Sequence, residues 1–371
     1  MMFHHDGRSY EEATTHAGKA MRERLHKEID EARAGSVTAL QRIEHEVPVD
    51  AVVKASALDF NVHLGRLVVG LREGELPGGP RAVHPWALGQ IAESLSIPKG
   101  YVQALIGRKD GTWGPELAAH NLTQLTRHRE DKQLLRMVDG DLRGFLSPRY
   151  QRRNPGVLLD AFVRACNRFN LLPARAFCSD TKHGVHAVLD TILEPIPNEP
   201  IGIGVFYGES PFGNGATEVS VSIKRMWCSN LAVSEQNLRA VHSGGTLTED
   251  VVWSEETYRK DTQLAASKIV DMLEACVGPA SVVRLMDGIK LAHEKKITGT
   301  AVEAFLKKHL SKEDSREVVK LYNSADVEML PAGNTVWRAS NAISFFGGQQ
   351  SDEEKKLDLQ KLAGKAMTAF A

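Results

Sequence analysis

The spacing of hydrophobic positions changes along the chain and predicts elements of different kinds. In residues 9–34, apolar side chains recur every three or four positions among charged ones, which predicts a helix with a narrow apolar face. Residues 36–48 fit either a strand or a short helix. Residues 51–58 and 62–71 are apolar and favour extended structure, and the Pro/Gly-rich residues 75–80 predict a turn or loop.

Two short helices joined near Ser96 are predicted over residues 88–106, because Pro98 suits the first turn of a helix. The residues placed to pack the pair together are Ile91, Leu95, Val102 and Ile106. The pair resembles a helix-turn-helix. The side chains that its second helix would offer to DNA are Lys99, Gln103, Arg108 and Lys109. Two packed helices without a DNA-binding role are the alternative.

The centre of the chain predicts a helix followed by a β-meander. Residues 157–169 place their apolar side chains on one helical face. The residues that follow predict strands over 172–180, 185–194, 201–207 and 217–228. The gaps between these strands are too short for helical crossovers, so neighbouring strands are expected to run antiparallel. Residues 208–215 are rich in glycine and predict the loop of a long hairpin.

The last third of the chain changes to helical periodicity. The predicted helices span residues 255–276, 280–291, 300–309, 312–322 and 352–370. The expected fold class is therefore α+β, with an antiparallel β-meander packed on a helix, a helical N-terminal region and a helical C-terminal third. The expected organisation is a mainly helical region over residues 1–120 with the helix pair near 87–106, a basic α+β core over 121–246, and a helical region over 247–371.

Composition and charge exclude several classes of protein. The chain of 371 residues is 42% hydrophobic and carries a formal net charge of −1, so any binding of nucleic acid must come from local segregation of charge. No apolar stretch approaches the ~18 residues that span a bilayer. No secretory signal is visible at the N-terminus, and a cytoplasmic location is expected. The four cysteines contain no C-x-x-C pair and are expected to be reduced, buried thiols.

Positive charge is concentrated between residues 127 and 182. The basic residues of this cluster are Arg127, Arg129, Lys132, Arg136, Arg143, Arg149, Arg152, Arg153, Arg164, Arg168, Arg175 and Lys182. Acidic residues in the same window are half as many, which is typical of an electrostatic footprint for a polyanion. The nearby aromatic residues Phe145, Tyr150 and Phe177 would stack on unpaired bases. The alternative is that the arginines pair with carboxylates on a solvated face and the aromatic rings belong to the core.

Residues 224–230 close the fourth strand and form a second candidate for contact residues. Strand alternation places Lys224 and Met226 on one face and Arg225 and Trp227 on the other.

Catalytic and metal-binding patterns are weak in this chain. The glycines of residues 208–215 are not followed by the lysine of a phosphate-binding loop. His183 and His186 are a close histidine pair, but they lie at the start of a strand that would point the two rings apart. His242 has no nucleophile in a recognisable context. We therefore expect no enzyme activity, no cofactor and no metal site.

Three stretches resemble a phage- and plasmid-like family, the domain of unknown function numbered nine-three-two. They are LLRMVDGDLRGFLSPRYQRRNPGVLLDAF at residues 134–162, EVSVSIKRMWCSNLAV at 218–233, and NAISFFGG with LQKLAGKAM near the C-terminus. The most specific pieces are the Leu-Ser-x-Arg-Tyr element at residues 146–150 and the Cys-Ser-Asn turn at 228–230. Relatives usually continue that turn with glycine, which is absent here. The resemblance covers most of the chain and implies a mobile-element setting in a bacterial cell.

The leading hypothesis is a single-stranded DNA-binding protein that promotes strand annealing as a homo-oligomer, a ring or a filament, by analogy with recombination proteins of such elements. The residues expected to contact nucleic acid are Arg143, Arg149, Tyr150, Arg152, Arg153, Arg164, Arg168, Lys224 and Arg225. The alternatives are a sequence-specific DNA-binding regulator that uses the helix pair, and an assembly protein without a nucleic-acid role.

Overall fold

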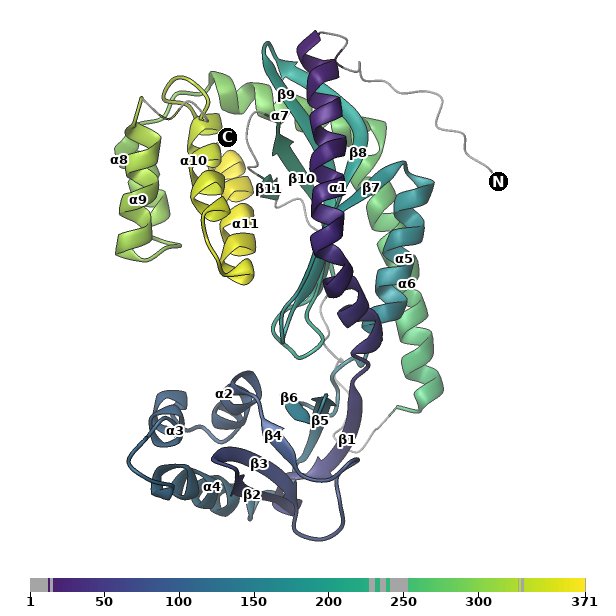
Figure 1. The fold of residues 1–371 in the computed structure, drawn as a ribbon, viewed down its shortest axis with the longest axis vertical. Helices are drawn as coiled ribbons and strands as arrows, with labels where there is room; N and C mark the ends of the chain where they lie inside the picture. Colours follow the sequence, from purple (N-terminus) through teal and green to yellow (C-terminus); the bar gives the residue numbers. More distant parts are fainter. Residues whose placement is uncertain are drawn as a thin grey trace.

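The computed structural model describes residues 13, 16–226, 231–233, 238–240, 253–325, 327 and 330–370 (Figure 1). The predicted α+β class is confirmed, including the helical N-terminus, the meander and the helical C-terminal third. The structure adds another sheet, formed within residues 49–146, which the sequence did not predict. Trp227 and the Cys-Ser-Asn turn lie outside the described residues.

The chain begins with one long helix, α1 (His16–His45), which runs along the second sheet (Figure 1). Of the two possibilities for residues 36–48, the helix is the one observed, up to His45. Leu25 and Ile29 are buried against Val188 and Ile192, so the narrow apolar face of this helix covers part of that sheet.

The first sheet collects strands from two separate parts of the sequence. Its members are β1 (Val49–Lys54), β2 (Leu58–His63), β3 (Arg66–Leu71), β4 (Arg81–Val83), β5 (Lys132–Val138) and β6 (Asp141–Leu146), in the order β1-β5-β6-β4-β3-β2. Only the short β4–β6 pairing is parallel. The two edge strands are joined by the short 3-10 turn Ala55–Ala57, so the sheet must curl until its edges approach each other at this end.

Three helices pack on the first sheet, namely α2 (Pro85–Ser94), α3 (Lys99–Ile106) and α4 (Trp113–Thr126). The predicted helix pair is confirmed, with Ile91 and Val102 buried in the shared core. The expected boundary at residue 120 falls inside α4, and β5 and β6 complete the sheet of β1–β4. The first structural unit therefore extends from β1 to β6.

The second sheet is the predicted meander. Its strands are β7 (Leu171–Cys178), β8 (His183–Ile196), β9 (Glu199–Glu209), β10 (Thr217–Arg225), β11 (Leu231–Val233) and β12 (Leu238–Ala240), in the order β11-β10-β9-β8-β7, with β12 also paired to β10. The helices α5 (Pro155–Arg168), α6 (Glu255–Val277) and α7 (Pro279–Glu294) pack on one face through a continuous apolar core. The other face meets α1 and the start of α11.

The C-terminal region contains α8 (Gly299–Leu306), α9 (Lys312–Asn323), α10 (Val336–Gly348) and α11 (Glu353–Ala369). The sequence did not predict α10. Nearly every side chain of this helix is buried, including the polar Ser340 and Asn341, so it lacks the alternation of apolar and polar faces that identifies an amphipathic helix.

The described helices include none that combines the length and the apolar character needed to cross a bilayer. Cys166 and Cys276 are buried thiols and Cys178 is partly buried, and burial raises the pKa of all three. Cys228 lies outside the described residues.

The histidine pair of β8 points its rings to opposite faces of the second sheet, because the two residues are three positions apart. His183 lies beside Tyr207 and His186 beside Phe206, and both are buried. Burial lowers the pKa of His183 to about 4, and burial with nearby cations lowers that of His186 to about 3. Both imidazoles are therefore neutral core groups at neutral pH.

These histidines predict a loss of stability in acid. Both folded pKa values lie below the ordinary value of about 6.5, so the unfolded chain takes up protons first as the pH falls. The free energy of unfolding should be highest above about pH 6.5. Below that pH it should decrease by up to about 1.4 kcal/mol per unit of falling pH for each histidine. Denaturant titrations at several pH values should show a smaller slope for His186→Leu, and an unchanged slope would contradict this assignment.

Candidate nucleic-acid interface

The predicted contact residues do not gather into one cationic track. They lie at the junction of the two sheet units, on the surface of α5, and at the far end of β10. Most of the charged ones already hold a carboxylate from a distant part of the chain. The residues therefore need to be considered by location.

At the junction, two of the predicted arginines are buried in ion pairs. Arg143 donates to Glu46 at the end of α1 at 2.6 Å. Arg153 lies 3.3 Å from Asp261 of α6 and also donates to Thr217 at 3.1 Å. These guanidinium groups join helices to sheets and are not available to a polyanion.

Arg152 belongs to the same set of contacts. It lies 4.0 Å from Asp50 of β1, and its guanidinium is 4.4 Å from the centre of the Tyr258 ring. Asp50 is mostly buried, and desolvation raises the pKa of this carboxyl although Arg136 and Arg152 oppose the rise. Arg152 thus connects Asp50 of β1 to Tyr258 of α6 and holds the strand against the helix.

The other predicted cations are paired at separate places. On α5, Arg164 contacts Asp160 at 2.5 Å, and Arg168 lies 3.9 Å from Glu274. On β10, Lys224 pairs with Glu28 of α1, and Arg225 donates to Glu199 at 2.6 Å. As predicted by strand alternation, Lys224 and Met226 share the face that meets α1.

Tyr150 is buried and does not offer its ring for stacking. Its hydroxyl donates to the backbone carbonyl of Ser210 at 3.0 Å, and burial raises the pKa of this hydroxyl well above its usual range. The prediction of a stacking role is wrong, because the ring belongs to a small core with Leu134 and Leu146.

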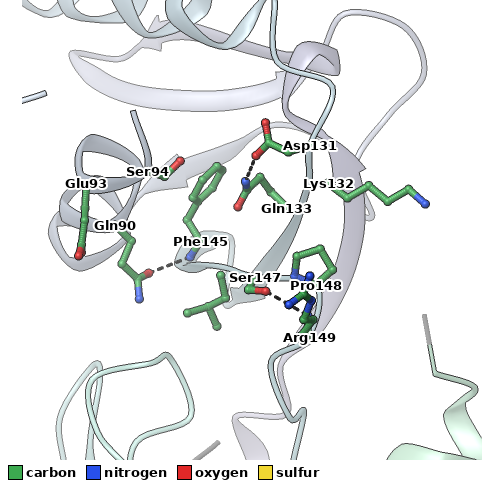
Figure 2. A pocket seen from close by; sticks show the side chains of 11 residues that line it. Gln90, Glu93, Ser94, Asp131, Lys132, Gln133, Phe145, Ser147, Pro148 and Arg149 are labelled. Atoms are coloured by element: carbon green, nitrogen blue, oxygen red, sulfur yellow. Dashed lines mark hydrogen bonds between the residues drawn. The ribbon is translucent and has the colours of Figure 1, made fainter. Parts of the chain in front are cut away.

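Arg149 is the predicted residue that lines a pocket. The pocket encloses about 480 Å³ and is formed by α2, the start of β5 and the end of β6 with the residues that follow it (Figure 2). Residues 146–149 of the Leu-Ser-x-Arg-Tyr element make one wall. The Leu-Ser-x-Arg-Tyr element thus contributes four of its five residues to the pocket wall.

The pocket combines an aromatic ring, amides and charged groups. Figure 2 shows the ring of Phe145 between the α2 side chains Gln90 and Ser94 and the strand residue Gln133. The amide nitrogen of Gln133 donates to Asp131 at 2.5 Å. Lys132 stands at the rim with its side chain directed outward, and within the described part of the chain its ammonium forms no ion pair.

The pocket forms where the first sheet leaves a strand edge open. β4 pairs with β6 only at Asp141 and Leu142, so the later residues of β6 have no strand on that side. The backbone N–H of Phe145 donates instead to the side-chain oxygen of Gln90 at 2.8 Å. The site therefore presents side-chain amides together with groups of both charges, the cations Lys132 and Arg149 and the carboxylates Glu93 and Asp131.

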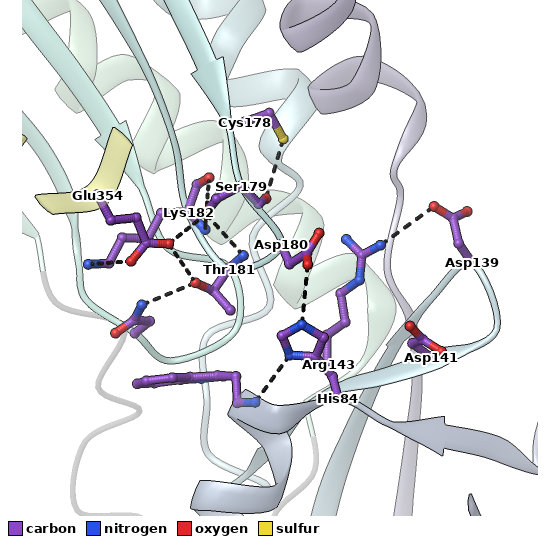
Figure 3. Close-up of polar contacts among 12 residues, drawn as sticks. His84, Asp139, Asp141, Arg143, Cys178, Ser179, Asp180, Thr181, Lys182 and Glu354 are labelled. Carbon is purple, nitrogen blue, oxygen red and sulfur yellow. Dashed lines mark hydrogen bonds and ion pairs between the residues drawn. The ribbon is translucent and has the colours of Figure 1, made fainter. Parts of the chain in front are cut away.

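A polar network joins the two sheet units close to the pocket (Figure 3). His84, at the start of α2, lies 3.3 Å from Asp180 in the β7–β8 turn. Arg42 of α1 donates to the same carboxylate at 2.7 Å, and these hydrogen bonds lower the pKa of Asp180. Thr181 and Lys182 of this turn contact Glu354 at the start of α11.

The helix pair exposes part of its second helix. Ser96 takes a left-handed conformation (φ 55°) in the turn, which lets α3 fold back against α2. Gln103 and Lys99 are both exposed, and the Lys99 side chain lies over Gly89 of α2. Tyr101 and Trp113 are 47% and 43% exposed, so this surface carries aromatic rings as well as cations.

The described residues contain no group of three or more His, Cys, Asp or Glu side chains that would hold a metal ion. Comparisons of the chain with protein-family models, curated proteins and solved structures found no match. The resemblance to the phage and plasmid family thus depends on the residues quoted for it.

The ion pairs at the junction predict a structural role for Arg152 and Arg153. Replacing both by glutamate should destabilise the fold by about 3–5 kcal/mol, because acidic side chains would then face Asp50 and Asp261 in a buried region. Chemical denaturation measures the change. The exposed Arg164→Glu is the control and should cost no more than about 1 kcal/mol. Equal effects of the two substitutions would show that the junction pairs are not structural.

Proposed function

We propose that the protein binds single-stranded DNA and that its pocket holds one unpaired nucleotide of the strand. The observation that carries the proposal is the pocket of about 480 Å³ between α2 and the Leu-Ser-x-Arg-Tyr element, with Lys132 and Arg149 in its lining. A space of this size suits a small, flat ligand. A base enters such a space only when it is out of the duplex stack, which favours a single strand.

The chemistry of the lining supports a division of roles. The base would enter beside the edge of Phe145, whose ring is 5% exposed and belongs to the core of the first sheet. The amides of Gln90 and Gln133 would then contact the polar edge of the base. The phosphates would follow the rim, where Lys132 points outward. Contacts of this kind involve no covalent step.

The proposal extends to strand annealing by a homo-oligomer, a ring or a filament, in a phage or another mobile element within the bacterial cytoplasm. This extension is supported by the resemblance of residues 134–162 and 218–233 to the phage and plasmid family. Mixing two complementary labelled oligonucleotides with the protein tests it, because annealing brings the labels together. Particle images of the same sample report rings or filaments.

The double substitution of Lys132 and Arg149 by glutamate is expected to weaken binding of a thymidine oligonucleotide by at least about tenfold. The loss of two phosphate contacts should also reduce the slope of log affinity against log salt by about 1.4. Fluorescence anisotropy across a salt series measures both quantities. The control is Arg164→Glu, an exposed charge on α5, which should leave affinity close to that of the parent protein. Parent-like binding by the double variant would exclude this pocket.

The helix pair supports a second candidate function, sequence-specific binding to duplex DNA. The observation in its favour is the tight turn at Ser96 between α2 and α3, which leaves Gln103 exposed. Under this alternative, Gln103→Ala with Lys99→Ala should abolish preference for a selected duplex site and leave binding of single strands unchanged. Selection from a random duplex library followed by gel shift measures this. The third possibility, an assembly protein, predicts no binding of either form of DNA.

A further inference from the structure

The tip of the β9–β10 hairpin, residues 210–216, belongs to the other sheet unit. It contacts the pocket wall at Gln90. Trp86 and Gln90 of α2 both donate to the carbonyl of Phe212, at 3.0 and 2.9 Å. The Tyr150 hydroxyl, one residue beyond the pocket wall, donates to the carbonyl of Ser210. The tip is therefore held by hydrogen bonds from both sides of the pocket.

Gln90 connects the hairpin tip to the pocket directly. Its side-chain oxygen accepts the N–H of Phe145, and its side-chain nitrogen donates to Phe212. Because a primary amide has one oxygen and one nitrogen, these two bonds select a single orientation of the Gln90 side chain. The position of the hairpin tip thus determines how Gln90 and Phe145 line the pocket.

Gly213 provides the close approach that this contact requires. It has φ of 80°, a conformation that costs other residues about 1–2 kcal/mol. A Cβ atom at this position would lie 2.5 Å from Cδ2 of Leu146 and 3.0 Å from Nε2 of Gln90. Both of these residues line the pocket. Any side chain at position 213 would therefore displace part of the pocket wall.

We infer that the hairpin tip positions the pocket, and that binding of a strand is coupled to docking of the two sheet units. The inference depends on the proposed function for the nature of the ligand. A ligand that needs Phe145 and Gln90 in their observed places binds better when the tip is docked. By linkage, a bound ligand stabilises the docked arrangement by the same factor.

The hairpin tip also connects to the C-terminal region, through Asn214. Asn214 donates to the hydroxyl oxygen of Thr181 at 3.1 Å, and this hydroxyl donates to Glu354 of α11 at 3.1 Å. The tip thus lies between the pocket and α11. Asn214 contacts the side away from the pocket, which makes it a matched control for Gly213.

The first experiment compares Gly213→Ala with Asn214→Ala without DNA. Hydrogen exchange of the Phe145 amide should be about tenfold faster in Gly213→Ala, because the bond from this amide to Gln90 is disturbed. Asn214→Ala should leave this amide at the parent rate. An unchanged Phe145 rate in Gly213→Ala would overturn the inference.

The second experiment measures binding of a thymidine oligonucleotide by the same variants. Gly213→Ala should weaken binding about tenfold although residue 213 does not line the pocket, and Asn214→Ala should weaken it far less. Trp86→Phe provides an independent variant. It cannot donate to Phe212 and residue 86 does not line the pocket, so it should lower affinity as Gly213→Ala does.

The two experiments separate failure of the inference from failure of the proposed function. Faster exchange at Phe145 in Gly213→Ala, with no binding of DNA by the parent protein, supports the positioning role and rejects DNA as the ligand. Binding of DNA by the parent, with parent-like affinity in both Gly213→Ala and Trp86→Phe, supports the function and rejects the coupling.

Discussion

The arrangement of the molecule depends on how the tips of the second sheet dock on α2. The carbonyl of Phe212 accepts two side-chain donors from that helix, and Asp180 in the neighbouring turn meets His84 at its start. The hairpins of a meander project from their own sheet, so their tips are free to contact another unit. This contact reaches the pocket wall through Gln90 and brings α11 close to the same loops. The pocket is lined by the first unit alone, but one of its side chains is held by the second.

The buried ion pairs around this junction explain why the basic cluster in the sequence does not form a groove. Arg143 and Arg153 reach carboxylates on α1 and α6, where burial makes a broken pair costly. Their function is to hold β5 and β6 and the following loop against the helices. Arginine suits this role because its planar group donates several hydrogen bonds in fixed directions. The pocket can then form beside them from Arg149, Lys132, the carboxylates Glu93 and Asp131, and uncharged groups.

The amphipathic helices and the meander were predictable because their signals are local. The gaps between β7, β8, β9 and β10 leave only antiparallel connections, and α5 shows its apolar face within a few turns. The first sheet was missed because β5 and β6 are separated from β1–β4 by three helices. α10 was missed because a helix buried on every side has no polar face. The pocket cations Lys132 and Arg149 were within the basic cluster, but no local signal separated Arg149 from the arginines that are structural.

The sequence by itself determined the element types over most of the chain, the α+β class and the location of the charge, since each follows from residues close together in the chain. The tertiary structure decided which charges are paired, and where a pocket exists. Lys224 and Glu28 are 196 positions apart, and Arg153 and Asp261 are 108 positions apart. Periodicity carries no information on such pairings, because the partners meet only after the sheets and helices have packed.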